Sequence, residues 1–182
     1  MPRARDIPNL ISLARIALVP PVVLMLLRGE YRLALWLFLI AGISDALDGF
    51  LAKRFAWESE FGGKLDPAAD KLLLVSCFLT LGWVGLLPWW LVALVLLRDV
   101  VIVIGWIAYN RRIQRIRARP MAISKFNTFA QILLVLLVVA DQLAPLLSPA
   151  WLRGLQWVVA LTTVASGLAY VRYWGRKALH HD

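Results

Sequence analysis

Four aspartates stand close together in a chain that has few acidic side chains. Only 11 of the 182 residues are Asp or Glu, and four of them are Asp45, Asp48, Asp66 and Asp70. The first two are three residues apart and the last two are four apart, so each pair shares one face of a helix. Pro67 suits the first turn of the second helix. Carboxylates gathered beside an apolar region need protons or cations to compensate their charge. An all-oxygen set favours Mg²⁺ or Mn²⁺, which carboxylates usually hold together with a substrate phosphate.

Small residues accompany these aspartates. Gly49 follows Asp48 directly, Ala52 lies one turn further along the same face, and Gly62 precedes Asp66. A missing side chain lets a ligand or another backbone approach closely. The pattern therefore predicts room for a ligand beside the carboxylates.

Other interpretations of the aspartates remain open. Asp45 and Asp48 could pair with Lys71 or Arg98 in a buried ion-pair network that orients helices and has no catalytic role. Intramembrane carboxylates also relay ions in transporters and proton channels. Charges inside a membrane are costly, so a function is the default expectation.

The elements that position these residues are long apolar runs. Hydrophobic residues make up 61% of the chain and charged residues 17%, against about 45–50% and 25% in a soluble domain. Spans of about 20 residues would cross a membrane, and they should be helices because lipid offers no partner to open backbone groups. The expected spans are 7–27, 33–51, 70–87, 89–109, 124–143 and 150–173. We predict an all-α, polytopic bundle of six transmembrane helices in a single domain, residues 1–182.

The basic residues lie mainly on one side of this bundle. Of the 20 Lys and Arg residues, 14 lie at the two termini or at the connections after the second and fourth spans. The positive-inside rule then places both termini, and the aspartates, on the cytoplasmic side. The first span has no cleavage site and no transit segment precedes it, so we expect a multi-pass protein of a bacterial inner membrane. The net charge of +9 then indicates anionic lipid, and no nucleic acid, as partner.

The spacing of the aspartates also matches a known pattern. The stretch Asp45-x2-Asp48-Gly49-x2-Ala52-Lys53-x8-Gly62-x3-Asp66-x3-Asp70 resembles the signature of the CDP-alcohol phosphotransferase family, which usually has arginine in place of Lys53. The resemblance implies a six-helix membrane fold, usually a homodimer, that uses two divalent cations. It implies that the four aspartates are metal ligands and that Asp66 and Asp70 are catalytic, with Asp70 as general base. Gly49, Ala52 and Gly62 would leave room for the cytidine diphosphate, and Lys53 would lie near its phosphates.

The resemblance implies a reaction as well. A hydroxyl attacks the lipid-side phosphorus of CDP-diacylglycerol, and CMP leaves. The chain is more similar to members that use phosphatidylglycerol and form cardiolipin than to members that use glycerol 3-phosphate. The latter typically carry Arg-Glu in place of Arg98-Asp99 and Gly-Lys in place of Ser124-Lys125.

Both acceptors carry a phosphate, so cations are expected near the cytoplasmic mouth. The candidate substrate-binding residues are Arg15, Arg98, Arg112 and Lys125. Arg98 has an alternative role as the partner of Asp99 in an internal ion pair. Arg112 also has an alternative role, in which it sets the topology and attracts anionic lipid.

Overall fold

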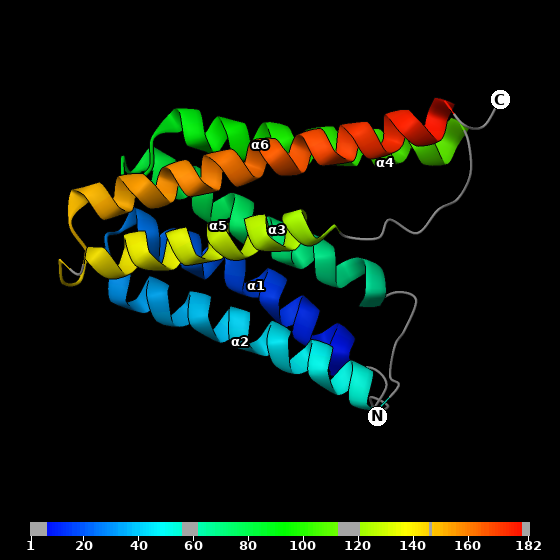
Figure 1. Ribbon diagram of the computed structural model, residues 1–182. Coiled ribbons are helices and arrows are strands. Elements are labelled where there is room, and N and C mark those ends of the chain that lie inside the picture. The colour runs from blue at the N-terminus through cyan, green and yellow to red at the C-terminus, as the bar shows by residue number, and fades with distance from the viewer. Residues whose placement is uncertain (1–6, 56–61, 113–120, 146, 180–182) are drawn as a thin grey trace. The chain divides into compact units, whose positions relative to one another are not determined.

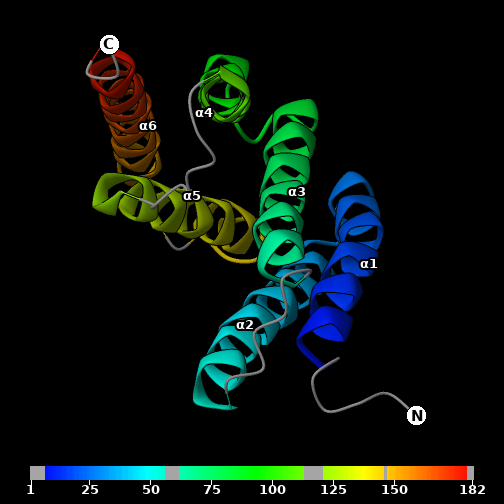
Figure 2. The same ribbon diagram turned by 90° about the vertical axis from the view of Figure 1, so that its right-hand side faces the viewer.

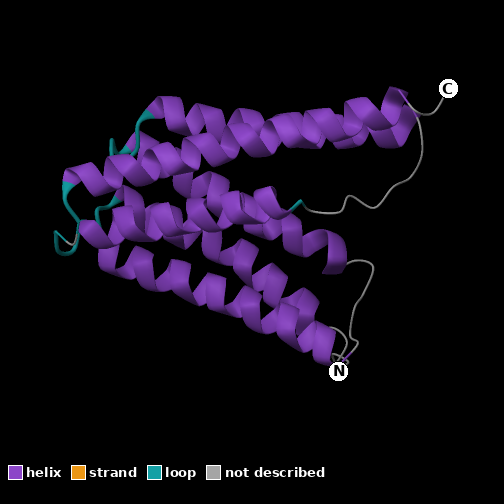
Figure 3. Cartoon of the chain, viewed as in Figure 1, coloured by secondary structure: helices purple, strands orange, loops and turns teal. Residues whose placement is uncertain are grey.

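In the computed structural model, the regular structure of the described residues is helical (Figures 1 and 3). The structure describes residues 7–55, 62–112, 121–145 and 147–179, and side chains within 13–44, 69–105, 121–145 and 147–173. Throughout these ranges the regular elements are α-helices, and no strand occurs. They are α1 (Ile7–Leu27), α2 (Tyr31–Phe55), α3 (Gly62–Trp83), α4 (Trp89–Arg112), α5 (Ala122–Asp141) and α6 (Pro149–Leu179). The predicted all-α class is confirmed for the described part of the chain.

Helix α3 begins earlier than the sequence predicts. The other five helices begin within two residues of the expected spans, whereas α3 begins at Gly62 instead of at Asp70. Pro67 is therefore the sixth residue of the helix, and its expected place in the first turn was wrong. Hydropathy marks only the apolar part of a helix, while backbone hydrogen bonding continues through polar residues. The longer helix contains Asp66 as well as Asp70.

Two helices have the length and hydropathy of a membrane span. Among the described residues these are Ala122–Asp141 and Pro149–Tyr173. Leu13–Leu27 and Tyr31–Ser44 are apolar helical segments of shorter length.

The chain forms two compact units. The first comprises Met1–Leu86 with Val138–Leu146, and the second comprises Leu87–Leu137 with Leu147–Asp182. The predicted aspartate cluster belongs to the first unit. Arg98 belongs to the second.

In the first unit, α1 packs against both α2 and α3 (Figures 1 and 2). The buried residues of all three helices recur at helical spacing, as expected for helices that each have one packed face. They include Arg15, Val19, Val22 and Leu26 on α1, Ala34, Phe38 and Ala41 on α2, and Ala69, Leu73, Cys77 and Leu81 on α3. Small side chains on α2 and α3 let the helices approach closely, which is how helices associate in lipid.

A glycine in the left-handed region ends α1. Gly29 has a φ of 72°, which a residue without Cβ adopts at no steric cost. The N–H of Glu30 donates to the carbonyl of Met25 at 2.9 Å, which closes the last turn. Gly85, with a φ of 80°, ends α3 in the same way. Both helices therefore stop at a defined residue.

In the second unit, α4 and α6 lie side by side and run in the same direction. The ring centroids of Trp90, the second residue of α4, and Trp157, the ninth residue of α6, are 5.2 Å apart, and Arg98 bonds to Ser166 further along both helices. Buried residues again recur at helical spacing, for example Val159 and Thr163 on α6.

Candidate active site

Helices α2 and α3 carry the four predicted metal ligands. Asp45 and Asp48 belong to α2, and Asp66 and Asp70 belong to α3. The helical backbone places the two members of each pair on one face, as the spacing predicts. The side chains of Asp45, Asp48 and Asp66 lie outside the described residues. The convergence of the four carboxylates therefore stays a prediction.

The predicted nucleotide-binding residues lie on the same two helices. Gly49, Ala52 and Lys53 belong to α2, and Gly62 is the first residue of α3. Their surroundings lie outside the described side chains, as do those of Arg112 at the end of α4. Their roles also remain predictions.

Asp70 forms an ion pair with Arg15. Nη1 of Arg15 on α1 donates to Oδ1 of Asp70 on α3 at 2.5 Å. The Arg15 side chain is 1% exposed, whereas that of Asp70 is 46% exposed. Two residues that the sequence singled out separately, 55 positions apart, are thus brought together in the first unit.

The donor chemistry of the four aspartates fits a hard divalent cation. Within the described side chains, no group of three His, Cys, Asp or Glu residues could hold a metal ion. The three remaining predicted ligands are carboxylates, the type that Mg²⁺ and Mn²⁺ prefer. The half-exposed carboxylate of Asp70 is open enough for an ion to reach it.

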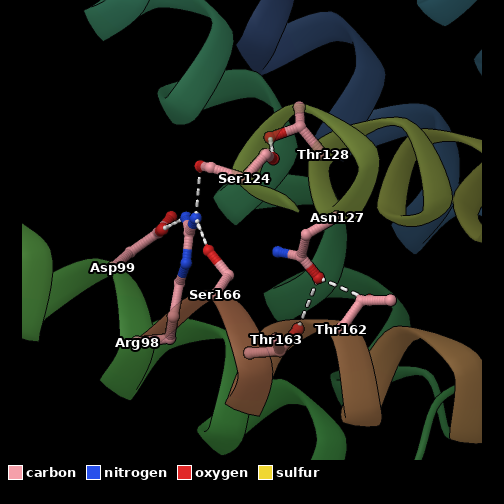
Figure 4. A network of polar contacts seen from close by, with 8 residues as sticks. All are labelled: Arg98, Asp99, Ser124, Asn127, Thr128, Thr162, Thr163 and Ser166. Carbon is pink, nitrogen blue, oxygen red and sulfur yellow. Dashed lines mark hydrogen bonds and ion pairs between the residues drawn. The ribbon is translucent and has the colours of Figure 1, made fainter. Parts of the chain in front are cut away.

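Arg98 is the centre of a polar network that links α4, α5 and α6 (Figure 4). Its Nη1 donates to Oδ1 of Asp99 at 2.7 Å. Its Nη2 donates to Oγ of Ser124 on α5 at 2.5 Å and to Oγ of Ser166 on α6 at 2.6 Å. The guanidinium carbon lies 6.0 Å from the ring centroid of Tyr170. The ion pair between Arg98 and Asp99, one of the two expected alternatives, is confirmed.

Asn127 forms a second polar link between α5 and α6 (Figure 4). Its Oδ1 accepts hydrogen bonds from the hydroxyls of Thr162 and Thr163, both at 2.9 Å. Asn127 and Thr163 are fully buried. No role for these residues follows from their spacing in the sequence. The available signal was polar side chains inside otherwise apolar spans.

Lys125 lies in the first turn of α5, directly after Ser124 of the Arg98 network. Its side chain is exposed, so it is accessible to an anionic substrate. Arg98 contrasts with it, because its side chain is only 7% exposed and already bonded to three residues.

The helical architecture and the aspartate spacing agree with one family of enzymes. The sequence model described as CDP-alcohol phosphatidyltransferase matches residues 5–169, which include all four aspartates and the Arg98 and Asn127 networks. The chain belongs to the CDP-alcohol phosphatidyltransferase family, which confirms the resemblance inferred from the spacing.

Similar curated proteins fall into two groups. The cardiolipin synthase (CMP-forming) of Rattus norvegicus is 33% identical over 95% of this chain and 62% of its own length. The probable cardiolipin synthase (CMP-forming) of Drosophila melanogaster is 34% identical over 91% of this chain and 56% of its own length. The probable phosphatidylglycerophosphate synthase of Mycobacterium tuberculosis is 33% identical over 93% of this chain and 81% of its own length. The chain thus spans about three fifths of the first two relatives.

Proposed function

We propose that the chain is an integral membrane phosphatidyltransferase. It transfers the phosphatidyl group of CDP-diacylglycerol to phosphatidylglycerol, which forms cardiolipin and releases CMP. The observation that carries this proposal is the family match over residues 5–169, which contains the complete aspartate spacing. The match covers parts of both compact units, and this supports a single functional domain.

In the proposed reaction a free hydroxyl of the phosphatidylglycerol headgroup attacks the phosphorus that carries the diacylglycerol. The new oxygen–phosphorus bond replaces the bond to CMP, and the hydroxyl proton passes to the carboxylate of Asp70. An aspartate is a weak base, so the hydroxyl must be held in position before its proton moves. The half-exposed carboxylate of Asp70 is open to such a hydroxyl.

Two divalent cations, Mg²⁺ or Mn²⁺, would be held by Asp45, Asp48, Asp66 and Asp70, and when bound they neutralise charge on the attacking and leaving oxygens. Gly49, Ala52 and Gly62 leave space for the cytidine diphosphate, and Lys53 binds its phosphates. Lys125, Arg98 and Arg112 provide positive charge for the acceptor phosphate. The exposed side chain of Lys125 supports this role most directly.

Glycerol 3-phosphate is the alternative acceptor. Relatives named for each product match the chain with almost the same identity. Phosphatidylglycerol is preferred because the sequence has Arg98-Asp99 and Ser124-Lys125 at the positions where the two groups differ. A lipid acceptor must enter laterally from the bilayer, whereas glycerol 3-phosphate enters from water.

The proposed setting is a bacterial inner membrane. The complete proposal is a homodimer in which each chain has six spans, both termini in the cytoplasm and a cytoplasmic active site. The two helices with the length and hydropathy of a span and the one-sided basic residues support the membrane placement.

The deciding experiment is an assay of purified full-length protein in lipid nanodiscs. CDP-diacylglycerol is supplied with either phosphatidylglycerol or glycerol 3-phosphate, with Mg²⁺, with Mn²⁺ or with a chelator, and CMP and lipid products are measured. We expect metal-dependent CMP release with phosphatidylglycerol and formation of cardiolipin. Product formed only from glycerol 3-phosphate would establish the alternative acceptor.

Ion transport is the competing class, because intramembrane carboxylates also serve as relays. It predicts ion flux across sealed proteoliposomes without any need for CDP-diacylglycerol. Absence of CMP release with every lipid or polyol acceptor, together with such flux, would end the enzyme proposal.

A further inference from the structure

Arg15 is an unusual residue for the middle of an apolar helix. It lies on the buried face of α1 with Val19, Val22 and Leu26, and it is 1% exposed. A charged side chain at such a site is costly and usually serves a function through a specific partner. The structure identifies Asp70 as a partner, with Nη1 and Oδ1 at 2.5 Å.

The two partners differ in their access to the surroundings. The Arg15 side chain is 1% exposed and that of Asp70 is 46% exposed. Ala69, the residue before Asp70, is fully buried, so Asp70 lies at the rim of the interface between α1 and α3. The guanidinium thus contacts the carboxylate from the protein interior, while part of the carboxylate remains open. A substrate that reaches Asp70 would not reach Arg15.

We propose that Arg15 is a positioning residue that fixes the orientation of the Asp70 carboxylate. This inference rests on the proposed function, in which Asp70 accepts the proton of the acceptor hydroxyl. It replaces the direct contact between Arg15 and substrate that the sequence suggested. Proton transfer depends on the direction of the accepting oxygen. A carboxylate free to rotate would meet the hydroxyl in a productive geometry less often.

The position favours arginine over lysine. The guanidinium is planar and rigid, so the Nη1–H of Arg15 reaches Oδ1 of Asp70 from a fixed direction, whereas an ammonium acts as a compact point charge on a flexible stem. Arg15→Lys should therefore keep the charge and lose part of the orientation. Arg15→Gln should lose both.

The first test separates kcat from KM in the full chain in nanodiscs. For Arg15→Gln we expect kcat to fall by between about tenfold and a hundredfold, with the KM values for CDP-diacylglycerol and for the acceptor within about twofold of wild type. Arg15→Lys should recover part of kcat. Arg28→Gln, which alters an exposed arginine just beyond the same helix, is the matched control and should behave as wild type. A raised KM with unchanged kcat would show direct substrate contact and overturn the proposal.

The second test measures the ion pair without any assay of activity. The thermal unfolding midpoint is recorded for Arg15→Gln, Asp70→Asn and the double variant. Asp70→Asn should lower it most, because it removes a carboxylate that compensates the charge of the buried Arg15 side chain. The double variant should be more stable than Asp70→Asn alone, a non-additivity typical of residues in contact. Strictly additive shifts would show that the pair does not form.

The two tests fail in different ways. A wild-type protein that releases no CMP would overturn the proposed function and the catalytic part of this inference. The thermal cycle would still decide whether Arg15 holds Asp70. If Arg15→Gln does not fold, Arg15→Lys gives the same kcat and KM comparison, and activity equal to wild type would overturn the need for a guanidinium.

Discussion

Nη2 of Arg98 on α4 lies 2.6 Å from Oγ of Ser166 on α6 and donates a hydrogen bond to it. Both residues are buried. The contact fixes the axial register of the two parallel helices, because each helix contributes a residue near its middle. Arg98 therefore has a structural role in the second unit, in addition to any role in substrate binding.

Replacing Ser166 by alanine removes the acceptor of this hydrogen bond. We expect Ser166→Ala to lower the free energy of unfolding by about 1 kcal/mol, the scale of interhelical hydrogen bonds in membranes. Unfolding in mixed micelles would measure the change. Thr128→Ala is the control, because among the described residues the Thr128 hydroxyl bonds to the carbonyl of Ser124 within its own helix and to no other helix. Equal effects of the two substitutions would contradict an interhelical role for Ser166.

The two threonines that bond to Asn127 should differ in how much they stabilise the protein. Thr163 is fully buried and its hydroxyl donates to Asn127. The hydroxyl of Thr162 has the carbonyls of Val158 and Val159 as further acceptors. Thr163→Val, which keeps the shape of the side chain, should therefore destabilise the protein more than Thr162→Val. Unfolding midpoints measured side by side would check this order, and the reverse order would contradict it.

Substitution of the predicted catalytic aspartates should abolish most turnover. We expect Asp66→Asn and Asp70→Asn to lower kcat by at least about a hundredfold, the scale of lost general-base or metal assistance. CMP release per folded protein, with folding checked by size-exclusion chromatography, is the measurement. Asp141→Asn is the control. It changes a carboxylate at the C-terminal end of α5, the end opposite to Lys125, and should retain activity. A fully active Asp66 or Asp70 variant would remove that residue from its assigned role.

Arg112 should contribute to binding more than to chemistry. Arg112→Ala removes one positive charge from the end of α4, so KM for the anionic acceptor should rise by several-fold while kcat changes little. Initial rates over a range of acceptor concentrations would show this. An unchanged KM would favour the alternative, in which Arg112 serves only topology and attraction to anionic lipid.

The helices were predictable because apolar runs and helix length are both local properties. Five of the six starts agree within two residues. The start of α3 was missed because four of its first five residues, Gly62 to Asp66, are small or polar, and hydropathy gives little signal there. The Schellman-type turns at Gly29 and Gly85 are also local and follow from the need for positive φ.

Partners distant in sequence were not predictable in the same way. Arg15 and Asp70 were each singled out by type and spacing, but periodicity does not show which face of α1 meets which face of α3. The same limit applies to Asn127 and Thr163. Each stands out as polar within an apolar span, and only the structure shows that the hydroxyl of Thr163 donates to Oδ1 of Asn127.

The length of α6 has a consequence for the edge of the bilayer. Its 31 residues extend about 46 Å at 1.5 Å per residue, whereas the hydrocarbon layer is about 30 Å thick. The surplus amounts to about three helical turns. In the proposed topology these turns would extend from the hydrocarbon layer into the headgroup region on the cytoplasmic side. A protease added on that side would cleave the part of α6 that reaches water and leave the part inside the bilayer intact.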